Sequence, residues 1–373
     1  MRVAIVDTYY AAFLASHYRA NPGLAQAGYE RQHRALLDSS FGTSDAYSRD
    51  LAALGHEAVE VVANCRPMQL KWAEERSLSL PRAARLRPAR LNWGTMRRIL
   101  DAQIEEFRPD VVYVQDVGHV DRLQPRSLGA DRRLLVAQVG SEPSSLEALS
   151  RYDLVTTLVP SLVSRLRANG VEAEYLSAAF DEAVITRLEA AGTGADPGAQ
   201  RRHPVSFVGS VHPESVHRGG VNLLERLCSD VDLEVWGPIH AKLSRSSSIR
   251  SRHRGEAWGL DMYEVLAQSR IAVNRHGDFA GGHAANMRMF EATGVGALLM
   301  TEAAPNLSSF FEPGREVVAY EGVEDLVSKI RHFLDHDDER RAIAAAGQRR
   351  TLAEHTYRRR MEQLAGMLES RAA

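Results

Sequence analysis

The chain has 373 residues, which is too long for one ordinary hydrophobic core and suits two α/β domains of typical size. Hydrophobic residues make up 44% and charged residues 25%, a balance that excludes a disordered chain and a membrane-embedded one. The formal net charge of −2 gives no overall attraction to nucleic acid, so a nucleic-acid polymer is not an expected partner. The two cysteines, Cys65 and Cys228, lie far apart in sequence without partners at metal-ligand spacing, so neither a disulfide framework nor a zinc site is indicated.

The N-terminal sequence MRVAIVDTYY contains a short apolar run after one arginine, which is too short for a secretory signal. No stretch of the sequence approaches the roughly 20 apolar residues that span a bilayer. We therefore expect no transmembrane segment and a cytoplasmic location.

Short apolar runs of the first half favour buried parallel strands, and helical patterns separate several of them. The runs lie at residues 2–7, 56–64, 110–116, 132–140 and 153–159. Ser44 is expected to cap a helix that stops at Gly55. A second helix is expected from Gly94 to Phe107, ahead of Pro109. This alternation predicts a parallel sheet, which receives ligands beyond the carboxyl ends of its strands.

Residues 190–204, AAGTGADPGAQRRHP, have no apolar periodicity and predict a linker. The strand-like runs then restart at residues 205–209, 232–237, 270–274, 296–300 and 315–320. We therefore expect a Rossmann-like domain over residues 1–189 and a second one over residues 205–354. Residues 355–373 are expected to form a C-terminal helix that can cross back to the first domain.

Several common motifs are absent from the sequence. Neither half has a G-x-G-x-x-G turn after a strand, which argues against a nicotinamide-dependent dehydrogenase. The absence of G-x-x-x-x-G-K-[ST], H-E-x-x-H and G-x-S-x-G argues against a P-loop ATPase, a zincin and an α/β-hydrolase. Asp335 and Asp337 have D-x-D spacing, but they end a helical pattern, so they are interpreted as solvated charges. No metal site is expected.

The most informative segment is residues 262–301, MYEVLAQSRIAVNRHGDFAGGHAANMRMFEATGVGALLMT. It combines an apolar strand that ends in Asn274, a glycine-rich loop, N-x-R-x-F-E at residues 286–291, and G-x-G-A-L-L-M-T. This combination resembles the C-terminal domain of CgeB-like (spore maturation protein) glycosyltransferases, a group related to glycosyltransferase family 4. The similarity extends over nearly the whole second half and is looser over residues 136–181. It implies a GT-B fold, in which two Rossmann-like domains face a central cleft.

A sugar nucleotide presents ribose hydroxyls and a diphosphate, so its site needs a carboxylate, a cation and helix N-terminal amides. The resemblance implies that Glu291 accepts hydrogen bonds from the ribose. Arg288 and the amides near Asn286 are then expected to neutralise the diphosphate. Helical spacing places Arg288 and Glu291 on one face and turns Phe290 toward the core.

One position departs from the pattern of family 4, whose members usually carry two glutamates eight positions apart. The first of these contacts the donor sugar, and here that position is His283. His283 and the loop around it can donate hydrogen bonds to the sugar, and a simple packing role for His283 is the alternative. Asn274, at the end of its strand, is a further candidate for contact with the donor.

Residues 207–220, FVGSVHPESVHRGG, resemble the first strand and phosphate-side loop of the family. This similarity makes Gly209, Ser210 and Arg218 candidates for contact with the diphosphate. The segments VWGP and RGEAWGLDMYE fall where the family surrounds the base, so Gly237, Gly255 and Trp258 are candidates there. Trp258 is equally well explained as a core residue.

An inverting GT-B enzyme needs a general base from the N-terminal domain to deprotonate the acceptor hydroxyl. The candidates are His17, in the loop expected after the first strand, Asp116, at a strand end, and His119. A retaining enzyme would need none of them as a base and would stabilise an oxocarbenium-like transition state electrostatically.

The sequence thus predicts a metal-independent hexosyltransferase that uses a nucleotide sugar, with a UDP-sugar favoured, and no other cofactor. The acceptor is a hydroxyl of a small molecule, a glycan or a protein, and the oligomeric state stays open. One alternative is a nucleotide-sugar epimerase of the same fold, and another is a non-catalytic two-domain binding protein.

Overall fold

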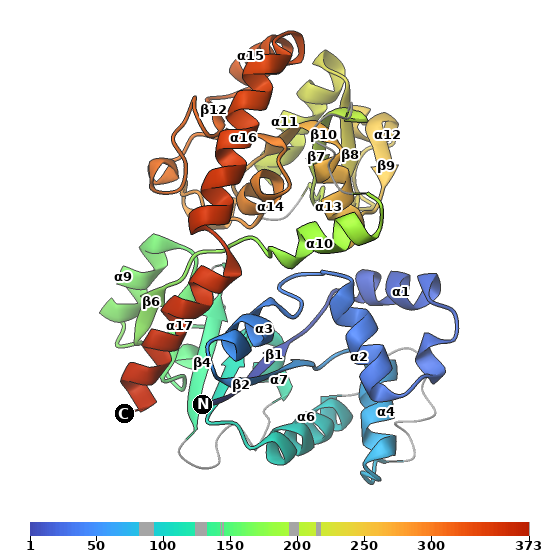
Figure 1. Ribbon diagram of the computed structural model, residues 1–373, viewed down its shortest axis with the longest axis vertical. Coiled ribbons are helices and arrows are strands. Elements are labelled where there is room, and N and C mark those ends of the chain that lie inside the picture. The colour runs from blue at the N-terminus through green and yellow to red at the C-terminus, as the bar shows by residue number, and fades with distance from the viewer. Residues whose placement is uncertain are drawn as a thin grey trace. The chain divides into compact units, whose positions relative to one another are not determined.

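The chain folds into two compact units, each built around one parallel sheet (Figure 1). Unit 1 comprises Met1–Leu176 and Met361–Ala373, and unit 2 comprises Ser177–Arg360. The computed structural model describes residues 1–81, 93–123, 133–141, 143, 145–193, 201–213 and 218–372. No helix among these residues is long and apolar enough to cross a membrane.

The sheet of unit 1 has six parallel strands in the order β2-β1-β3-β4-β5-β6. The strands are β1 (Arg2–Asp7), β2 (Glu57–Val62), β3 (Val111–Val114), β4 (Leu134–Val139), β5 (Leu154–Thr157) and β6 (Ala173–Tyr175). Helices cover both faces of a parallel sheet, which explains why β3 is four consecutive buried residues. The sequence predicts the first five strands and misses β6, which has three residues and too short a pattern.

Helices connect the strands of unit 1. They are α1 (Ala11–Ala20), α2 (Tyr29–Asp38), α3 (Ala46–Ala53), α4 (Arg66–Glu75), α6 (Trp93–Phe107), α7 (Val117–Leu123), α8 (Leu146–Leu149) and α9 (Pro160–Ala168), with a 3₁₀ turn at η1 (Leu24–Gln26). The α6 helix confirms the prediction for this segment. Ser44 does not cap α3, because its φ of 51° is left-handed and its hydroxyl donates to the Leu37 carbonyl.

The sheet of unit 2 also has six parallel strands, in the order β12-β11-β10-β7-β8-β9. The strands are β7 (His203–Val208), β8 (Leu233–Trp236), β9 (His253–Gly255), β10 (Ser269–Asn274), β11 (Leu298–Glu302) and β12 (Val318–Tyr320). The sequence predicts all of these except β9, an edge strand of three residues. Two α/β units with parallel sheets confirm the predicted fold class.

The helices of unit 2 include one that the sequence analysis assigns to the first domain. They are α10 (Ala183–Ala190), α11 (Arg218–Asp230), α12 (Ser248–Arg252), α13 (Leu260–Ala267), α14 (Arg288–Gly294), α15 (Val323–Asp335) and α16 (Asp337–Glu354), with 3₁₀ turns η3 (Asp278–Ala280) and η4 (Leu307–Ser309). Unit 1 ends at Leu176 rather than at residue 189, because α10 contacts α13 and Phe180 pairs with Thr356. Residues 194–200 of the expected linker lie outside the described residues.

The last helix, α17 (Tyr357–Ala372), continues from unit 2 into unit 1. Its residues up to Arg360 belong to unit 2, and the residues from Met361 onward belong to unit 1. Leu364 and Leu368 are fully buried, and Arg371 forms an ion pair of 2.9 Å with Glu172 of the same unit. The C-terminal residues therefore supply part of the core of unit 1.

Two glycines allow a close approach between the carboxyl ends of β7 and β8. Gly237 has a φ of 118°, and a Cβ on it would lie 2.4 Å from the carbonyl oxygen of Gly209. The Gly209 amide donates to the Trp236 carbonyl at 2.9 Å, which holds the two chains at this separation. A side chain at position 237 would force the strand ends apart.

We expect Gly237→Ala to lower the free energy of unfolding by at least about 2 kcal/mol more than Gly255→Ala. Both residues have nearly the same left-handed φ, 118° and 116°, but a Cβ on Gly255 meets no atom within 4 Å. The pair therefore separates the backbone clash from the cost of a positive φ, which is about 1 kcal/mol. Urea unfolding followed by circular dichroism measures the difference, and equal destabilisation would contradict the close approach.

Candidate functional site

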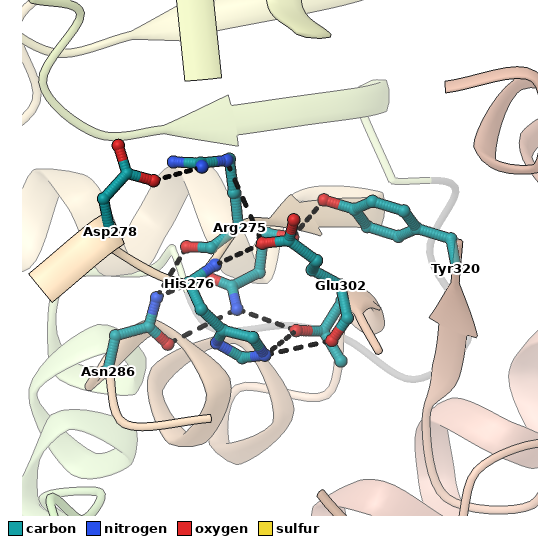
Figure 2. A network of polar contacts seen from close by, with 8 residues as sticks. Arg275, His276, Asp278, Asn286, Glu302 and Tyr320 are labelled. Atoms are coloured by element: carbon teal, nitrogen blue, oxygen red, sulfur yellow. Dashed lines mark hydrogen bonds and ion pairs between the residues drawn. The ribbon is translucent and has the colours of Figure 1, made fainter. Parts of the chain in front are cut away.

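Polar side chains gather at the carboxyl ends of β10 and β11 in unit 2 (Figure 2). The buried amide of Asn274 donates to Thr301 Oγ1 at 2.9 Å, and its oxygen accepts from Asn286 Nδ2 at 2.9 Å. The Asn286 amide also donates to the Arg275 carbonyl at 2.9 Å, and the Tyr320 hydroxyl donates to the Asn274 carbonyl at 2.8 Å. These bonds fix the loop that follows β10 against the loop that precedes α14.

Arg275 places a cation beside the start of α11. Its guanidinium pairs with Asp278, and Nε lies 3.9 Å from Glu302 Oε2. A Cβ on Gly219 would lie 2.5 Å from the Arg275 Nη2 atom, so a side chain at position 219 would displace this guanidinium. A cation is unfavourable beside the positive end of a helix dipole, and the two carboxylates offset this cost. The position is suited to an anionic ligand.

His276 is buried and neutral at pH 7. Its Nε2–H donates to the Glu302 carbonyl at 3.0 Å, which leaves Nδ1 as the acceptor. Burial lowers the pKa of His276 to about 4, against the opposing effect of that hydrogen bond. Nδ1 is buried and has no hydrogen-bond partner among the described residues. The ring thus offers one unused acceptor.

These residues line a pocket of about 110 Å³ beside the N-terminal end of α11. Its polar lining residues are Ser210, Arg275, His276 and Asn286. Apolar residues of β7 and α11 form the rest, including Phe207, Val221 and Leu224, together with the backbone of Gly220 and Gly277. A cation, polar side chains and a helix N-terminus together can hold a phosphate group.

Glu291 and Arg288 form an ion pair on α14. Arg288 Nη1 lies 2.7 Å from Glu291 Oε2, and the Tyr263 hydroxyl donates to Glu291 Oε1 at 3.4 Å. Glu291 is 5% exposed. The predicted shared face is confirmed, and Phe290 is buried against other aromatic rings, as predicted. The Arg288 guanidinium is thus held by the carboxylate in this structure.

Of the other candidate residues from the sequence analysis, some line the pocket and others do not. Ser210 is exposed at the pocket, whereas Gly209 and Gly237 contribute the close approach of β7 and β8. Trp258 is half-buried, and its indole donates to Glu256 at 2.9 Å, so it is not a core residue. Arg218 is the first residue of α11, and its side chain lies outside the described part of the chain.

His283 lies in the loop between η3 and α14. Its Nδ1 lies 3.2 Å from the Ala280 carbonyl, and the ring is half-buried. His283 is not among the residues that line the pocket beside α11.

In unit 1, carboxylates gather at the carboxyl ends of β1 and β3. Asp116 accepts hydrogen bonds from the Thr8 hydroxyl and, at 3.1 Å, from the His119 amide. The second bond is of the type that an N-cap makes, so it ties Asp116 to the start of α7. Burial raises the pKa of Asp7 to about 7, and the negative charge of Asp116 adds to this effect.

His17 lies on α1, not in a loop as the sequence analysis expects. It is 8% exposed, and burial lowers its pKa, so the ring is neutral at pH 7. Nε2 is buried without a hydrogen-bond partner among the described residues. His119 lies on α7 with its ring 4.8 Å from that of Trp93.

The D-x-D pair has a structural role. Asp335 ends α15 and Asp337 begins α16, as helix-end charges. Asp337 forms ion pairs with Arg270, Arg340 and Arg341, and the Arg340 guanidinium helps to lower its pKa to about 2. Within the described ranges, no three His, Cys, Asp or Glu side chains gather in a way that could hold a metal ion.

Sequence reasoning missed Arg275, His276 and Glu302. All three follow or end a predicted strand, and polar residues at the carboxyl end of a parallel strand are the available signal. The family resemblance includes N-x-R-x-F-E, which begins eleven residues beyond Arg275 in the sequence, and this motif does not contain these three residues.

Part of the chain is similar in sequence to a known family, and its fold is similar to that of solved structures. Residues 218–366 match the family described as "Glycosyl transferase-like". No curated protein sequence matches the chain.

Solved structures of glycosyltransferases share the fold over nearly the whole chain. HepE from Anabaena, in complex with UDP and glucose, is 14% identical, with 99% of this chain and 100% of that chain covered and a TM-score of 0.60. Sucrose-phosphate synthase from Thermosynechococcus elongatus is 11% identical, with 99% and 98% covered and a TM-score of 0.58. AviGT4, a glycosyltransferase involved in avilamycin A biosynthesis, is 15% identical, with 98% and 96% covered and a TM-score of 0.56.

Because the pKa of Asp7 is raised, replacing its carboxyl group by an amide should increase the free energy of unfolding by an amount that grows with pH. The folded-state pKa, about 7, exceeds the ordinary aspartate value of 3.8, so the contribution of Asp7 to stability falls as pH rises from about 4 to about 7. Asp7→Asn should therefore gain about 1–4 kcal/mol of unfolding free energy over wild type between pH 4 and pH 8.

Urea unfolding at several pH values measures this difference. Asp38→Asn, at an exposed position of α2, is the matched control and should show no such trend. A difference between Asp7→Asn and wild type that does not change with pH would contradict the assignment.

Proposed function

We propose that this chain is a glycosyltransferase that transfers a hexose from a nucleoside diphosphate sugar, which the family match of residues 218–366 and the fold shared with HepE support. A UDP-sugar is the favoured donor, because HepE, which shares the fold, has a structure with UDP and glucose. The acceptor is a hydroxyl of a small molecule, a glycan or a protein. The resemblance of residues 262–301 supports a place among the CgeB-like relatives of family 4, and no metal takes part.

The buried carboxylate of Glu291 is the observation that carries the donor assignment. A carboxylate has about four acceptor positions, and Arg288 and Tyr263 use two of them. Two acceptor positions are left, which is the number that the two vicinal hydroxyls of a ribose require. Arg288 then acts by orienting the Glu291 carboxylate, while the diphosphate is bound elsewhere.

The pocket beside α11 supplies the diphosphate contacts in this proposal. Arg275 brings the positive charge, the Ser210 hydroxyl is exposed to the pocket, and Gly220 brings backbone of the helix N-terminus. A bound diphosphate would compete with Asp278 and Glu302 for the Arg275 guanidinium. The unused Nδ1 of His276 is an acceptor for a hydroxyl of the donor.

The acceptor hydroxyl needs a base if the reaction inverts the anomeric centre. His17 is better suited than Asp116, because its ring is neutral and its Nε2 has no partner among the described residues. Both oxygens of Asp116 already accept hydrogen bonds. We therefore assign the base to His17, with Asp116 as the second candidate.

We expect Glu291→Gln to weaken UDP binding about ten- to a hundredfold. Loss of a charged hydrogen bond costs about 1.5–3 kcal/mol, and glutamine keeps the size of the side chain. Isothermal titration calorimetry measures the affinity. Glu312→Gln is the matched control, because Glu312 forms the same i,i+3 pair with Arg315 at an exposed position.

The ligand provides a second control for the same residue. A 2′,3′-dideoxy analogue of UDP should bind wild type weakly and lose little more affinity in Glu291→Gln, because its partner hydroxyls are gone. Unchanged UDP affinity in a folded Glu291→Gln protein would remove the ribose assignment.

We expect His17→Ala to lower kcat by roughly 10² to 10⁴ with little change in donor affinity. Asp116→Asn should disturb the start of α7 and have the smaller effect on kcat. Steady-state kinetics of sugar transfer, with donor affinity from calorimetry, separates the two effects. Near-normal turnover in both variants would favour a retaining mechanism.

A further inference from the structure

The carboxylate of Asp278 lies beside the start of α11, where a phosphate of the donor is proposed to bind (Figure 2). Its Oδ1 atom accepts a hydrogen bond from Arg275 Nη2 and forms an ion pair with it. The same atom lies 3.6 Å from the point that a Cβ on Gly219, the second residue of α11, would occupy. A negative charge is stabilised by the N-terminal end of a helix and by an arginine. Asp278 thus has both kinds of contact that a bound phosphate would have.

The guanidinium of Arg275 is packed against the same end of α11. A Cβ on Gly219 would lie 2.5 Å from Nη2, and a Cβ on Gly220 would lie 3.9 Å from Nη1. The Arg275 side chain is 17% exposed, whereas that of Asp278 is 42% exposed. The cation is therefore held by its surroundings, while the anion faces the solvent.

Arg275 is close to two carboxylates, and only one of them has a further bond. Glu302 ends β11, and its Oε2 also accepts from the His276 amide at 3.3 Å. The Asp278 side chain has no partner other than Arg275 among the residues that the structure describes. An anion that competes for Arg275 would therefore displace Asp278 and leave Glu302 in place.

Glycines flank the turn that carries Asp278. Asp278 begins the 3₁₀ turn η3, which Gly277 precedes and Gly281 follows. Gly281 and Gly282 are exposed and have left-handed φ angles of 58° and 83°. Glycine has the widest choice of backbone angles, so this turn can change its position without straining the residues on either side of it.

We propose that Asp278 is an internal competitor of the donor diphosphate, and that its ion pair with Arg275 is a latch that opens when the donor binds. The inference rests on the proposed function, in which Arg275 binds the diphosphate. In the donor complex, phosphate oxygens take over the contacts with Arg275 and with the start of α11. Asp278 then moves into the solvent with η3. The protein therefore binds its donor less tightly than the same pocket would without this carboxylate.

Asp278→Asn tests the sign of this effect, with UDP as the probe and calorimetric titration into the full chain as the measurement. Asparagine keeps the size of the side chain and removes its charge, so the latch is lost. The variant should bind UDP about two- to tenfold more tightly than wild type, because binding no longer has to break a competing ion pair. If Asp278 instead positioned Arg275 for the diphosphate, the same substitution would weaken binding.

A second background separates the latch from simple charge repulsion between Asp278 and the diphosphate. Arg275→Met removes the guanidinium and should weaken UDP binding at least about tenfold. In this background, Asp278→Asn should change UDP affinity by less than about twofold, because Asp278 acts through Arg275. Charge repulsion alone would give the same gain in both backgrounds.

Asp325→Asn is the matched control. Asp325 forms an ion pair with Lys329 on α15 at 2.7 Å, and it does not line the pocket beside α11. Its replacement removes the same charge from the same unit and should leave UDP affinity unchanged.

The failure of the latch can be told apart from the failure of the donor site. UDP binding by Asp278→Asn that is no tighter than that of wild type would overturn the latch, as would an equal gain in the Arg275→Met background. The diphosphate contact would stand in both cases if Arg275→Met weakens binding. Unchanged UDP affinity in a folded Arg275→Met protein would instead overturn the diphosphate contact, and the latch with it.

Discussion

The buried side chain of Asn274 holds together the parts of unit 2 on which the donor site depends. It ends β10, bonds to Thr301 of β11 and receives the amide of Asn286, which precedes α14. Two residues after Asn286, α14 begins with Arg288 and presents Glu291 one turn later. An amide can donate and accept at once, whereas a carboxylate can only accept. The position therefore needs an asparagine to orient α14 relative to the sheet.

The same edge of the sheet brings opposite charges together before any ligand binds. Arg275 pairs with Asp278 and approaches Glu302, and Arg288 pairs with Glu291. Each arginine therefore has a protein anion as its partner in this structure. In the proposed donor complex, a phosphate would replace one anion with another at Arg275, so the guanidinium would be desolvated only once. For Glu291, the proposed role leaves Arg288 in place, where it orients the carboxylate.

The sequence predicted much of the sheet architecture, because buried parallel strands are continuous apolar runs that can be recognised locally. It also predicted that Glu291 and Arg288 share a helical face. It did not predict that α10 joins unit 2, because that depends on contacts with α13 and on the pairing of Phe180 with Thr356. The sequence analysis places His17 in a loop, because the segment after β1 has no clear helical pattern. In the structure this segment forms α1.

In both units, the hydrogen bonding of individual side chains could not be predicted from the sequence. The hydrogen bond from His276 to the Glu302 carbonyl joins residues of different strand ends, and no local pattern reports it. The amide of Gln103, which has no hydrogen-bond partner among the described residues, is similarly hidden, because its place on the helical pattern of α6 is that of an ordinary buried residue.

The path of α17 affects the order in which the chain can fold during synthesis. Unit 1 is discontinuous in sequence, because its last element comes from residues 361–373 and the whole of unit 2 is made before it. Domains that are continuous in sequence can fold as they leave the ribosome. Here unit 2 can do so, while unit 1 is complete only after Leu364 and Leu368, which are fully buried, have been made. The N-terminal half of the protein is therefore the last to be completed.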